Sequence, residues 1–576
     1  MTRIAVIKKD KCNPVKCGEL CAKVCPVNRM GEDCIRIDAK AQIDEVLCTG
    51  CGICPKKCPY DAIMIINLPE ALKEDPIHQH GQNGFRLFSL PTPVFGKVVG
   101  LLGKNGIGKS TALKVIAGLL KPNLGQLDKE ATYNELISHF KGSEAQAFFE
   151  NLRDGNITVS YKPQEVELIP KTVKGTVRDL LKKVDEKGKF DEYVEKLELT
   201  RFLDNDIDKI SGGELQRVAI CASVMKKANL YMFDEPTSYL DIKQRIKVSK
   251  FIRELADEDT AVLVIEHDLI ILDYMTDLIH LMYGKAGGYG IVSLPKTTRV
   301  AINVYLEGYL REENVRFRDY EIKFHGKPID ELTKDIELVS WNDIDEIFGK
   351  FKLHAGEGTI NQNEVIGILG ENGIGKTSFV KTLAENNKSL EDVKLAYKPQ
   401  YLDKTEDLVI VYLQNAIDKY HNSIIRPLEI EPLYEKTLNQ LSGGELQRVC
   451  IAKILAEDAE LYLLDEPSAY LDAEQRLIVS KVIKEMMVVK DASCLVVDHD
   501  LLFIDYLSDR LLVFEGVPAI SGEAKGPFSM QDGMNNFLRE LNMTFRRDPD
   551  SNRPRANKPE SQMDRQQKSE NKLYYI

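Results

Sequence analysis

Two copies of one phosphate-binding motif decide the fold of this chain. Gly103-Lys-Asn-Gly-Ile-Gly-Lys-Ser110 and Gly370-Glu-Asn-Gly-Ile-Gly-Lys-Thr377 both match the pattern G-x4-G-K-[ST]. Each motif follows an apolar run typical of a buried strand, Val98–Leu102 or Val365–Leu369, and precedes a helical pattern. In that context the glycines let backbone N–H groups face phosphate oxygens, the lysine meets the β and γ phosphates, and the hydroxyl binds Mg2+. The sequence therefore predicts two α/β domains of the P-loop NTPase type.

Four further motifs accompany each phosphate loop in the same order. The first copy continues with Gln164 in Tyr-Lys-Pro-Gln, Ser211-Gly212-Gly213-Glu, the acidic pair Asp234-Glu235 and His267. The second copy contains Gln400, Ser442-Gly443-Gly444-Glu, Asp465-Glu466 and His499. Both acidic pairs end an apolar run, so their carboxylates should emerge at the sheet edge where ligands bind in open α/β folds. A serine with bare backbone N–H groups at a helix N-terminus suits a γ-phosphate.

Together these motifs resemble the nucleotide-binding domains of ATP-binding-cassette (ABC) proteins. The resemblance implies two composite ATP sites, in which the phosphate loop of one cassette faces the Ser-Gly-Gly-Glu signature of the other within one chain. It implies that Glu235 and Glu466 activate water and that His267 and His499 contact the γ-phosphate. The expected Mg2+ ligands are Ser110, Gln164 and Asp234 in one site and Thr377, Gln400 and Asp465 in the other. Further ATP contacts are expected from Asn105, Gly106, Gly108, Lys109, Thr111 and Ser442 to Gly444 in the first site, and from Asn372, Gly373, Gly375, Lys376, Ser378 and Ser211 to Gly213 in the second.

One aromatic residue precedes each phosphate loop. Phe85 and Phe351 are candidates for stacking on adenine, and a role in the core suits either ring equally well.

Nine of the twelve cysteines lie between Cys12 and Cys58. The second group of these reads C-x2-C-x2-C-x3-C-P, the spacing of bacterial ferredoxins, in which the cysteine before proline ligates the other cluster. By that crossover we expect two [4Fe-4S] clusters, one held by Cys48, Cys51, Cys54 and Cys25 and the other by Cys12, Cys17, Cys21 and Cys58. Cys34 is left over. Two tetrahedral zinc sites are the alternative, although zinc ribbons use paired C-x2-C knuckles.

Length and composition limit the remaining possibilities. A chain of 576 residues should hold roughly three to five domains, and 43% hydrophobic with 29% charged residues is typical of globular proteins. No apolar run approaches a membrane span and the N-terminus lacks the apolar core of a signal peptide, so we expect a soluble cytoplasmic protein without membrane contact. The formal net charge of −12 excludes a generic polyanion binder.

The motifs divide the chain into five expected segments. These are an iron-sulfur domain of ferredoxin-like α+β fold (1–76), a first cassette (77–298), a hinge segment (299–322), a second cassette (323–524) and a C-terminal hinge with a basic tail (525–576). The tail, with eight Lys/Arg and five Asp/Glu between Leu541 and Ile576, suits either an RNA contact or a solvated extension.

The first cassette carries an insertion. The interval from lysine to glutamine is 55 residues from Lys109 to Gln164 but 24 from Lys376 to Gln400, so the first cassette holds 31 additional residues. Apolar spacing over 133–153 predicts a helix-loop-helix, either a surface elaboration or, as we prefer for a feature that breaks the symmetry, a partner contact.

The complete order of segments resembles the ABC subfamily E ribosome-recycling ATPases, also called the RNase L inhibitor family. Cys48-Thr-Gly-Cys-Gly-Ile-Cys54, Val315-Arg-Phe-Arg-Asp319 and Phe545-Arg-Arg-Asp-Pro549 carry the resemblance, which spans essentially the whole chain. It implies ATP-driven splitting of ribosomes after termination or stalling, with a peptide-chain release factor or its stalled-ribosome paralogue. It also implies that the protein stays bound to the small subunit, in contact with ribosomal RNA and proteins, until the initiation machinery acts. We expect a monomer.

Two other functions are open at this stage. Clusters fused to an ATPase also suit an ATP-gated iron-sulfur electron-transfer protein, although no flavin or substrate motif accompanies them. A non-hydrolytic ribosome-binding protein is disfavoured by the intact Asp-Glu pairs in both cassettes.

Overall fold

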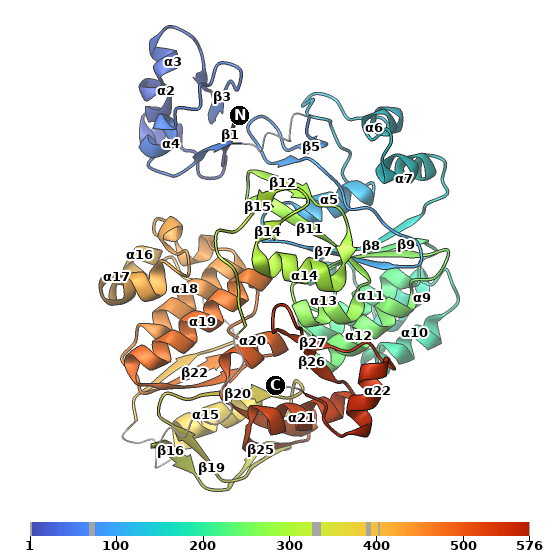
Figure 1. The fold of residues 1–576 in the computed structure, drawn as a ribbon, viewed down its shortest axis with the longest axis vertical. Helices are drawn as coiled ribbons and strands as arrows, with labels where there is room; N and C mark the ends of the chain where they lie inside the picture. Colours follow the sequence, from blue (N-terminus) through green and yellow to red (C-terminus); the bar gives the residue numbers. More distant parts are fainter. Residues whose placement is uncertain (1–2, 68–74, 325–335, 387–392, 401–403, 575–576) are drawn as a thin grey trace.

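The protein consists of a small N-terminal domain and two larger α/β domains in one assembly (Figure 1). The structure, a computed structural model, describes residues 3–67, 75–324, 336–386, 393–400 and 404–574. Figure 1 places the N-terminal domain at the top, the first cassette below it and the second cassette along the left side and the bottom, with strands β26 and β27 of the C-terminal segment between the cassettes. Among the described helices, none has the length and apolarity that crossing a bilayer requires.

The N-terminal domain combines two small antiparallel sheets with four short helices. Strand β1 pairs with β4, and β2 pairs with β3. The elements are β1 (Arg3–Ile7), α1 (Pro14–Cys17), α2 (Leu20–Val24), α3 (Pro26–Arg29), β2 (Ile35–Ile37), β3 (Ala41–Ile43), α4 (Ile53–Lys57) and β4 (Ile63–Asn67). Pro14 and Pro26 begin α1 and α3, where the missing N–H of proline is not needed. This is the ferredoxin-like α+β domain that the cysteine spacing predicts.

The first cassette is built on a nine-stranded sheet with the order β5-β6-β12-β11-β7-β10-β9-β8, while β13 pairs with β11. Its strands are β5 (His78–Gln79), β6 (Arg86–Leu87), β7 (Val98–Leu102), β8 (Val159–Lys162), β9 (Leu230–Asp234), β10 (Ala261–Ile265), β11 (Leu278–Lys285), β12 (Tyr289–Val292) and β13 (Lys296–Thr297). The five from β11 to β8 are parallel. Every residue of β7, β9 and β10 is buried, as expected for parallel strands covered on both faces.

Helices cover this sheet. They are α5 (Lys109–Ile116), α6 (Tyr133–His139), α7 (Glu144–Arg153), α8 (Ile169–Thr172), α9 (Val177–Val184), α10 (Phe190–Lys196), α11 (Gly212–Val224), α12 (Ile242–Glu254) and α13 (Leu269–Met275). The insertion forms α6 and α7, joined by a short loop, and its buried Leu136, Phe148 and Phe149 pack on the first cassette's core.

The second cassette repeats the same arrangement. Its eight-stranded sheet has the order β17-β18-β25-β24-β20-β23-β22-β21, and β16 pairs with β19 beside it. The strands are β16 (Glu337–Trp341), β17 (Ile344–Phe348), β18 (Phe351–Ala355), β19 (Gly358–Asn361), β20 (Val365–Leu369), β21 (Leu395–Lys398), β22 (Leu461–Asp465), β23 (Ser493–Val497), β24 (Arg510–Val517) and β25 (Ser521–Ser529). The helices are α15 (Lys376–Asn386), α16 (Val409–Tyr412), α17 (Gln414–Tyr420), α18 (Gly443–Leu455), α19 (Ala473–Lys490) and α20 (Leu501–Leu507). The predicted fold class is therefore confirmed.

Two connecting segments complete the chain. The internal segment contains α14 (Thr298–Glu307), β14 (Tyr309–Leu310) and β15 (Val315–Arg316), and the C-terminal segment contains α21 (Met530–Leu541), β26 (Phe545–Arg547), β27 (Pro554–Ala556) and α22 (Gln562–Ser569). Phe545 and Tyr574 are buried in a core shared with both cassettes. Each connecting segment thus packs on the cassettes.

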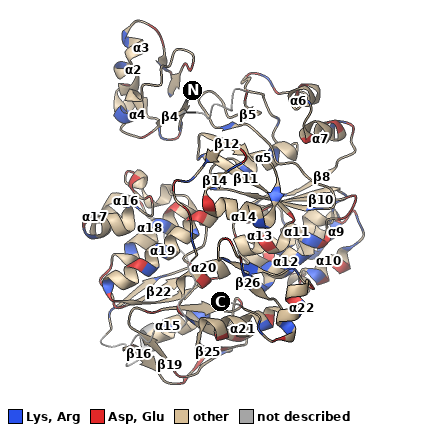
Figure 2. Ribbon diagram, viewed as in Figure 1, with Lys and Arg blue, Asp and Glu red and all other residues tan. Residues whose placement is uncertain are grey.

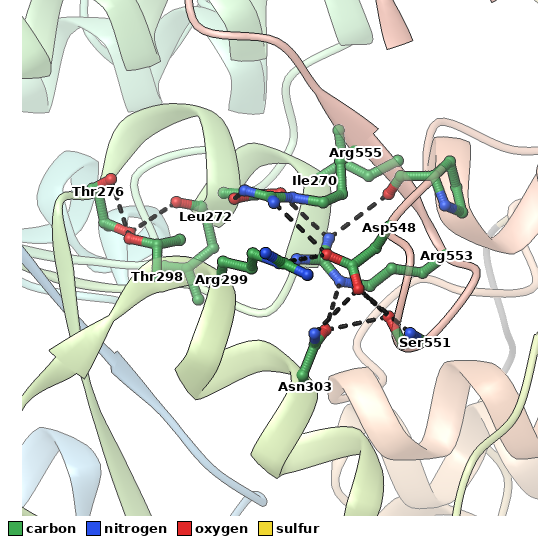
Figure 3. Close-up of polar contacts among 12 residues, drawn as sticks. Ile270, Leu272, Thr276, Thr298, Arg299, Asn303, Asp548, Ser551, Arg553 and Arg555 are labelled. Carbon is green, nitrogen blue, oxygen red and sulfur yellow. Dashed lines mark hydrogen bonds and ion pairs between the residues drawn. The ribbon is translucent and has the colours of Figure 1, made fainter. Parts of the chain in front are cut away.

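The interpretation of the C-terminus as a solvated basic tail is wrong, because its arginines are held by carboxylates of the cassettes. Arg553, with no exposed side-chain surface, and Arg555 both bind Asp273 of α13, at 3.1 and 2.8 Å. Figure 3 shows Arg299 and Asn303 of α14 converging on Asp548, whose carboxylate oxygens they reach at 3.0 and 2.9 Å. Figure 2 shows acidic and basic residues interspersed along α22. We call this contact of the C-terminal segment with α13 and α14 the C-terminal clamp.

Candidate ATP and iron-sulfur sites

The predicted ATP residues of each cassette gather at one edge of its sheet. The phosphate loop follows β7, Gln164 follows β8, Asp234-Glu235 end β9 and His267 follows β10, and these four strands are parallel neighbours. Their carboxyl ends therefore meet, which is where ligands bind in open α/β sheets. The second cassette places Gln400, Asp465-Glu466 and His499 in the same way after β21, β22 and β23.

In the first cassette three polar side chains converge on the Glu235 carboxylate. Gln164 Nε2 donates to Glu235 Oε1 at 2.7 Å, and His267 Nε2 lies 3.5 Å from the same oxygen. The Ser238 hydroxyl donates to Oε2 at 3.1 Å. Burial raises the pKa of Glu235, but the nearby His267 ring and the charge of Lys109 outweigh it and lower this pKa to about 2. The carboxylate is thus ionised, as a water-activating base must be.

The second cassette repeats this geometry with one difference. Gln400 Nε2 donates to Glu466 Oε1 at 2.7 Å and His499 Nε2 lies 3.6 Å from it. Ala469 occupies the position of Ser238, so it offers no hydroxyl to Glu466. Burial and the negative charge of Asp498 raise the pKa of Glu466. The two candidate bases therefore differ in protonation equilibrium although their backbones match.

Both glutamates hold a strained backbone. Glu235 has φ +47° and Glu466 φ +46°, a conformation that costs of order 1–3 kcal/mol for residues other than glycine. The strain is held by side chains from the signature helices: Gln216 Nε2 donates to the Glu235 carbonyl at 2.6 Å and Gln447 Nε2 to the Glu466 carbonyl at 2.8 Å. Strain retained twice with the same supports points to a functional constraint on where the carboxylate lies.

The candidate Mg2+ ligands adjoin one another. Thr377 Oγ1 donates to Asp465 Oδ2 at 2.8 Å, and Ser110 takes the equivalent place close to Asp234 in the first cassette. Burial raises the pKa of both aspartates. Asp234 Oδ1 is buried without a hydrogen-bond partner among the described residues. A hydroxyl beside a buried, under-satisfied carboxylate fits Mg2+, which prefers hard oxygen ligands.

Each phosphate-loop lysine hydrogen bonds to backbone carbonyls of its own loop. Lys109 Nζ donates to the carbonyls of Gly103 and Lys104 at 2.8 and 2.7 Å, and Lys376 Nζ to those of Gly370 and Glu371 at 2.9 and 2.5 Å. Burial lowers the pKa of both lysines, that of Lys376 to about 8.

The candidate adenine rings lie against the phosphate loops. Gly108 and Gly375, both at φ +92°, face Phe85 and Phe351, and a Cβ at either glycine would lie 2.4 or 2.8 Å from the ring. Only glycine allows this approach and this backbone. The contact puts each ring beside the phosphate-binding loop.

The two cassettes meet head to tail through the segments 238–241 and 469–472, which follow the acidic pairs and which we call the D-loops. The Asn105 N–H of the first phosphate loop donates to Asp472 Oδ2 at 3.0 Å, and the Asn372 N–H of the second donates to Asp241 Oδ2 at 3.3 Å. Ser211 and Ser442 cap α11 and α18, each accepting from the N–H three residues on. The expected contact of each signature with ATP on the facing phosphate loop stays a prediction.

The nine N-terminal cysteines surround two separate cavities. One is lined by Cys25, Cys34, Cys48, Cys51 and Cys54, and the other by Cys12, Cys17, Cys21 and Cys58. This division is the crossover that the ferredoxin spacing predicts, with Cys34 beside the first set. No group of His, Cys, Asp or Glu in the described residues is arranged to hold a single metal ion. Thiols that surround a cavity without converging on one point fit a cubane cluster better than one zinc ion.

Family models match most of these parts. The model described as "ABC transporter" matches residues 94–238 and 353–469. A "possible Fer4-like domain in RNase L inhibitor" matches residues 2–33, and "4Fe-4S binding domain" matches 41–64. The matches thus divide the chain into the same cassettes and cysteine domain as its motifs do.

Several curated proteins are similar over the full length. An uncharacterized ABC transporter ATP-binding protein of Methanocaldococcus jannaschii is 52% identical, over 100% of this chain and 98% of that protein. Translation initiation factor RLI1 of Saccharomyces cerevisiae is 42% identical, over 100% and 98%.

Solved structures agree. The model of ribosome-bound archaeal Pelota and ABCE1 contains a chain that is 52% identical with a TM-score of 0.91, covering 100% of this chain and 99% of that one. The complex of archaeal stalk protein aP1 with archaeal ribosome recycling factor aABCE1 has a chain 50% identical with a TM-score of 0.84, covering 88% and 100%.

Proposed function

Because this chain belongs to the RNase L inhibitor family of twin-cassette ABC proteins, we propose that it is an ATP-hydrolysing ribosome recycling factor. It splits ribosomes into subunits after termination or stalling and stays on the small subunit. The observation that carries the proposal is the head-to-tail contact of each phosphate loop with the D-loop aspartate of the other cassette, at 3.0 and 3.3 Å. Both sites therefore open and close as the cassettes separate and approach, which couples ATP to movement.

The names of the relatives support this assignment. One relative is a translation initiation factor, one structural neighbour is bound to a ribosome with Pelota, and another is a ribosome recycling factor in complex with a stalk protein. For this chain we propose the same class of partners: the small subunit with its RNA and proteins, a release factor or its stalled-ribosome paralogue, and the initiation machinery. Such a protein works in the cytoplasm, and we propose that it does so as a monomer.

The chemistry follows from the geometry of each site. We assign water activation to Glu235 and Glu466, Mg2+ binding to Asp234 with Ser110 and to Asp465 with Thr377, and the γ-phosphate contact to His267 and His499. His267 Nδ1 and Nε2 and His499 Nε2 are buried without hydrogen-bond partners among the described residues, so each histidine can serve a bound phosphate.

ATP can supply the free energy of closure. Moving a two-state machine from mostly open to mostly closed needs about 5.5 kcal/mol of differential binding. Hydrogen bonds to charged groups contribute about 1.5–3 kcal/mol each, so a few that form only around bridging ATP suffice. Hydrolysis then removes the bridge and resets the machine.

The cysteine domain would hold two [4Fe-4S] clusters, one on Cys25, Cys48, Cys51 and Cys54 and one on Cys12, Cys17, Cys21 and Cys58. Bound clusters would stabilise the fold of this small domain, because a preformed metal site rarely exists in the unfolded chain and the free energy of binding therefore adds to that of folding. Asn83 ties this domain to the first cassette: its side chain accepts from the Ile43 N–H at 2.8 Å and donates to the Ala5 carbonyl at 3.2 Å. Arg86 reinforces it by pairing with Glu45 at 2.5 Å.

Sedimentation of cognate ribosomes tests the function. Ribosomes incubated with the protein, release factor and MgATP should yield free subunits on a sucrose gradient, with the protein on the small subunit. Ribosomes that stay intact while ATP is hydrolysed would rule out recycling and favour another use of the ATPase.

A further inference from the structure

Two charged side chains occupy equivalent places just after the D-loops. Lys243 lies two residues beyond Asp241 and Glu474 two residues beyond Asp472, in the first turns of α12 and α19. Each reaches across the interface to the second residue of the facing phosphate loop. Glu474 Oε1 lies 2.9 Å from Lys104 Nζ, and Lys243 Nζ forms an ion pair with Glu371. The two contacts have the same geometry but opposite charges.

Each of these side chains also binds a connecting segment. Glu474 Oε2 pairs with Arg318 of the internal segment at 3.1 Å, and Glu474 Oε1 accepts from the Tyr320 hydroxyl at 2.9 Å. Lys243 Nζ pairs with Glu540 in α21 of the C-terminal segment at 3.3 Å. Glu474 and Arg318 are only 5% and 2% exposed, so water screens their pair weakly.

The double occurrence indicates that the link itself matters. Duplication alone would give the same residue at both positions, whereas here the charges of the phosphate-loop residue and its partner are both reversed and the bridge survives. The phosphate-loop end of each bridge is next to the nucleotide-binding backbone, because the carbonyls of Lys104 and Glu371 accept from Lys109 and Lys376. A shift of either loop therefore acts on the bridge directly.

We propose that Glu474 and Lys243 are positioning residues that transmit closure of each ATP site to one connecting segment. Glu474 serves the first phosphate loop and the internal segment, and Lys243 serves the second phosphate loop and α21. Each ATP site then orders its own segment, so the two segments respond separately to the two nucleotides. The charge reversal has a further consequence for association between two molecules. Two first cassettes facing each other would place Lys104 against Lys243, and two second cassettes would place Glu371 against Glu474, so both pairings would be disfavoured by like charges.

Hydrogen exchange on the full-length protein tests the proposal, with no ribosome present, so its outcome does not depend on the recycling activity. The reporters are amides that fold each segment: Phe317 and Arg318 bonded to the Gly308 carbonyl, and Met543 bonded to the Leu538 carbonyl. In the unsubstituted protein, a non-hydrolysable ATP analogue with Mg2+ should slow both sets by about tenfold. Glu474→Gln should abolish the slowing at Phe317 and Arg318 only, and Lys243→Met should abolish it at Met543 only.

Matched variants separate transmission from simple destabilisation. Glu485→Gln on α19 and Lys247→Met on α12 remove exposed charges from the same helices and should leave both responses intact. Tyr320→Phe removes only the hydroxyl that donates to Glu474, so it should reduce the slowing at Phe317 and Arg318. This variant keeps the proposal testable if Glu474→Gln fails to fold. A purely structural role would raise exchange by the same factor with and without the analogue. The proposal would be overturned if the ATP analogue slowed exchange equally in both segments of either bridge variant. It would also be overturned if the analogue slowed exchange in neither segment of the unsubstituted protein.

Discussion

Asp273→Asn should release the C-terminal clamp. The Asp273 carboxylate, 2% exposed, accepts from Arg553 at 3.1 Å and from Arg555 at 2.8 and 3.0 Å. The amide keeps the shape but leaves the fully buried Arg553 without its counter-charge. Within the part of the chain that the structure describes, the other hydrogen bonds of the Arg553 guanidinium are 3.5 Å long, to Asn303 and to the Pro554 carbonyl. Removing one partner of a buried ion pair costs about 3–5 kcal/mol, so the population of the undocked segment should rise about a hundredfold to several thousandfold.

Limited trypsin digestion measures this population. The bond between Arg555 and Ala556 lies in β27 of the docked segment, where Arg555 is half-buried and Ala556 is buried. Cleavage that is slow relative to reclosing follows the equilibrium fraction undocked. Asp550→Asn is the matched control, because Asp550 pairs with Arg299 at 2.7 Å but is 71% exposed, and such a pair contributes about 0–1 kcal/mol. If Asp273→Asn were cleaved no faster than Asp550→Asn, the account of the clamp as an ion-paired contact would be refuted.

Three further outcomes are expected. Phe85→Ala should raise the Kd for ATP at the first site by about fivefold or more if the ring stacks on adenine, since such stacking contributes about 1–3 kcal/mol per base, and an unchanged affinity would leave it a core residue. Anaerobically prepared Cys51→Ser should contain fewer iron atoms than Cys34→Ser, which should keep the full content; equal losses would contradict the ligand division. Asp268 belongs to the first cassette and Asp500 to the second, and burial and the charge of Asp500 raise the pKa of Asp268 to about 6. Because closure brings the two carboxyl groups together, closure is favoured below that pH, where Asp268 is protonated, and weakens as pH rises through it. ATP-analogue affinity should therefore increase from pH 7.5 to pH 5.5 by a factor that Asp268→Asn reduces, and an identical pH profile in the variant would contradict this.

The local motifs could be predicted from sequence because short spacing fixes their geometry. The phosphate loop, the Gln164 string and the acids at Asp234 lie at the ends of β7, β8 and β9, and their order along a parallel sheet brings them together without any long-range information. The cysteine spacing likewise divides the eight expected ligands between the two cavities, since the crossover is contained in 47 residues from Cys12 to Cys58, whereas it left the place of Cys34 open.

The contacts between distant segments could not be predicted in the same way. Arg553 and Asp273 are 280 residues apart, and nothing near either residue indicates its partner, so the C-terminal arginines looked like a solvated basic tail. The bridges of Glu474 and Lys243 were also missed. Their signal was present in the repeat, because aligning the two cassettes places Lys opposite Glu at both positions, but a search for identical motifs passes over a reversal of charge.

The sharpest test of the central claim, that closure around ATP splits the ribosome and hydrolysis resets the protein, is light scattering of cognate ribosomes in excess over the protein, with release factor and MgATP. The unsubstituted protein should split the whole pool with repeated turnover, whereas Glu235→Gln/Glu466→Gln should stop after about one ribosome per protein, because closure supplies the free energy and only reset is lost. Undiminished scattering by the unsubstituted protein, while it hydrolyses ATP, would contradict the account, as would full multiple turnover by the double variant.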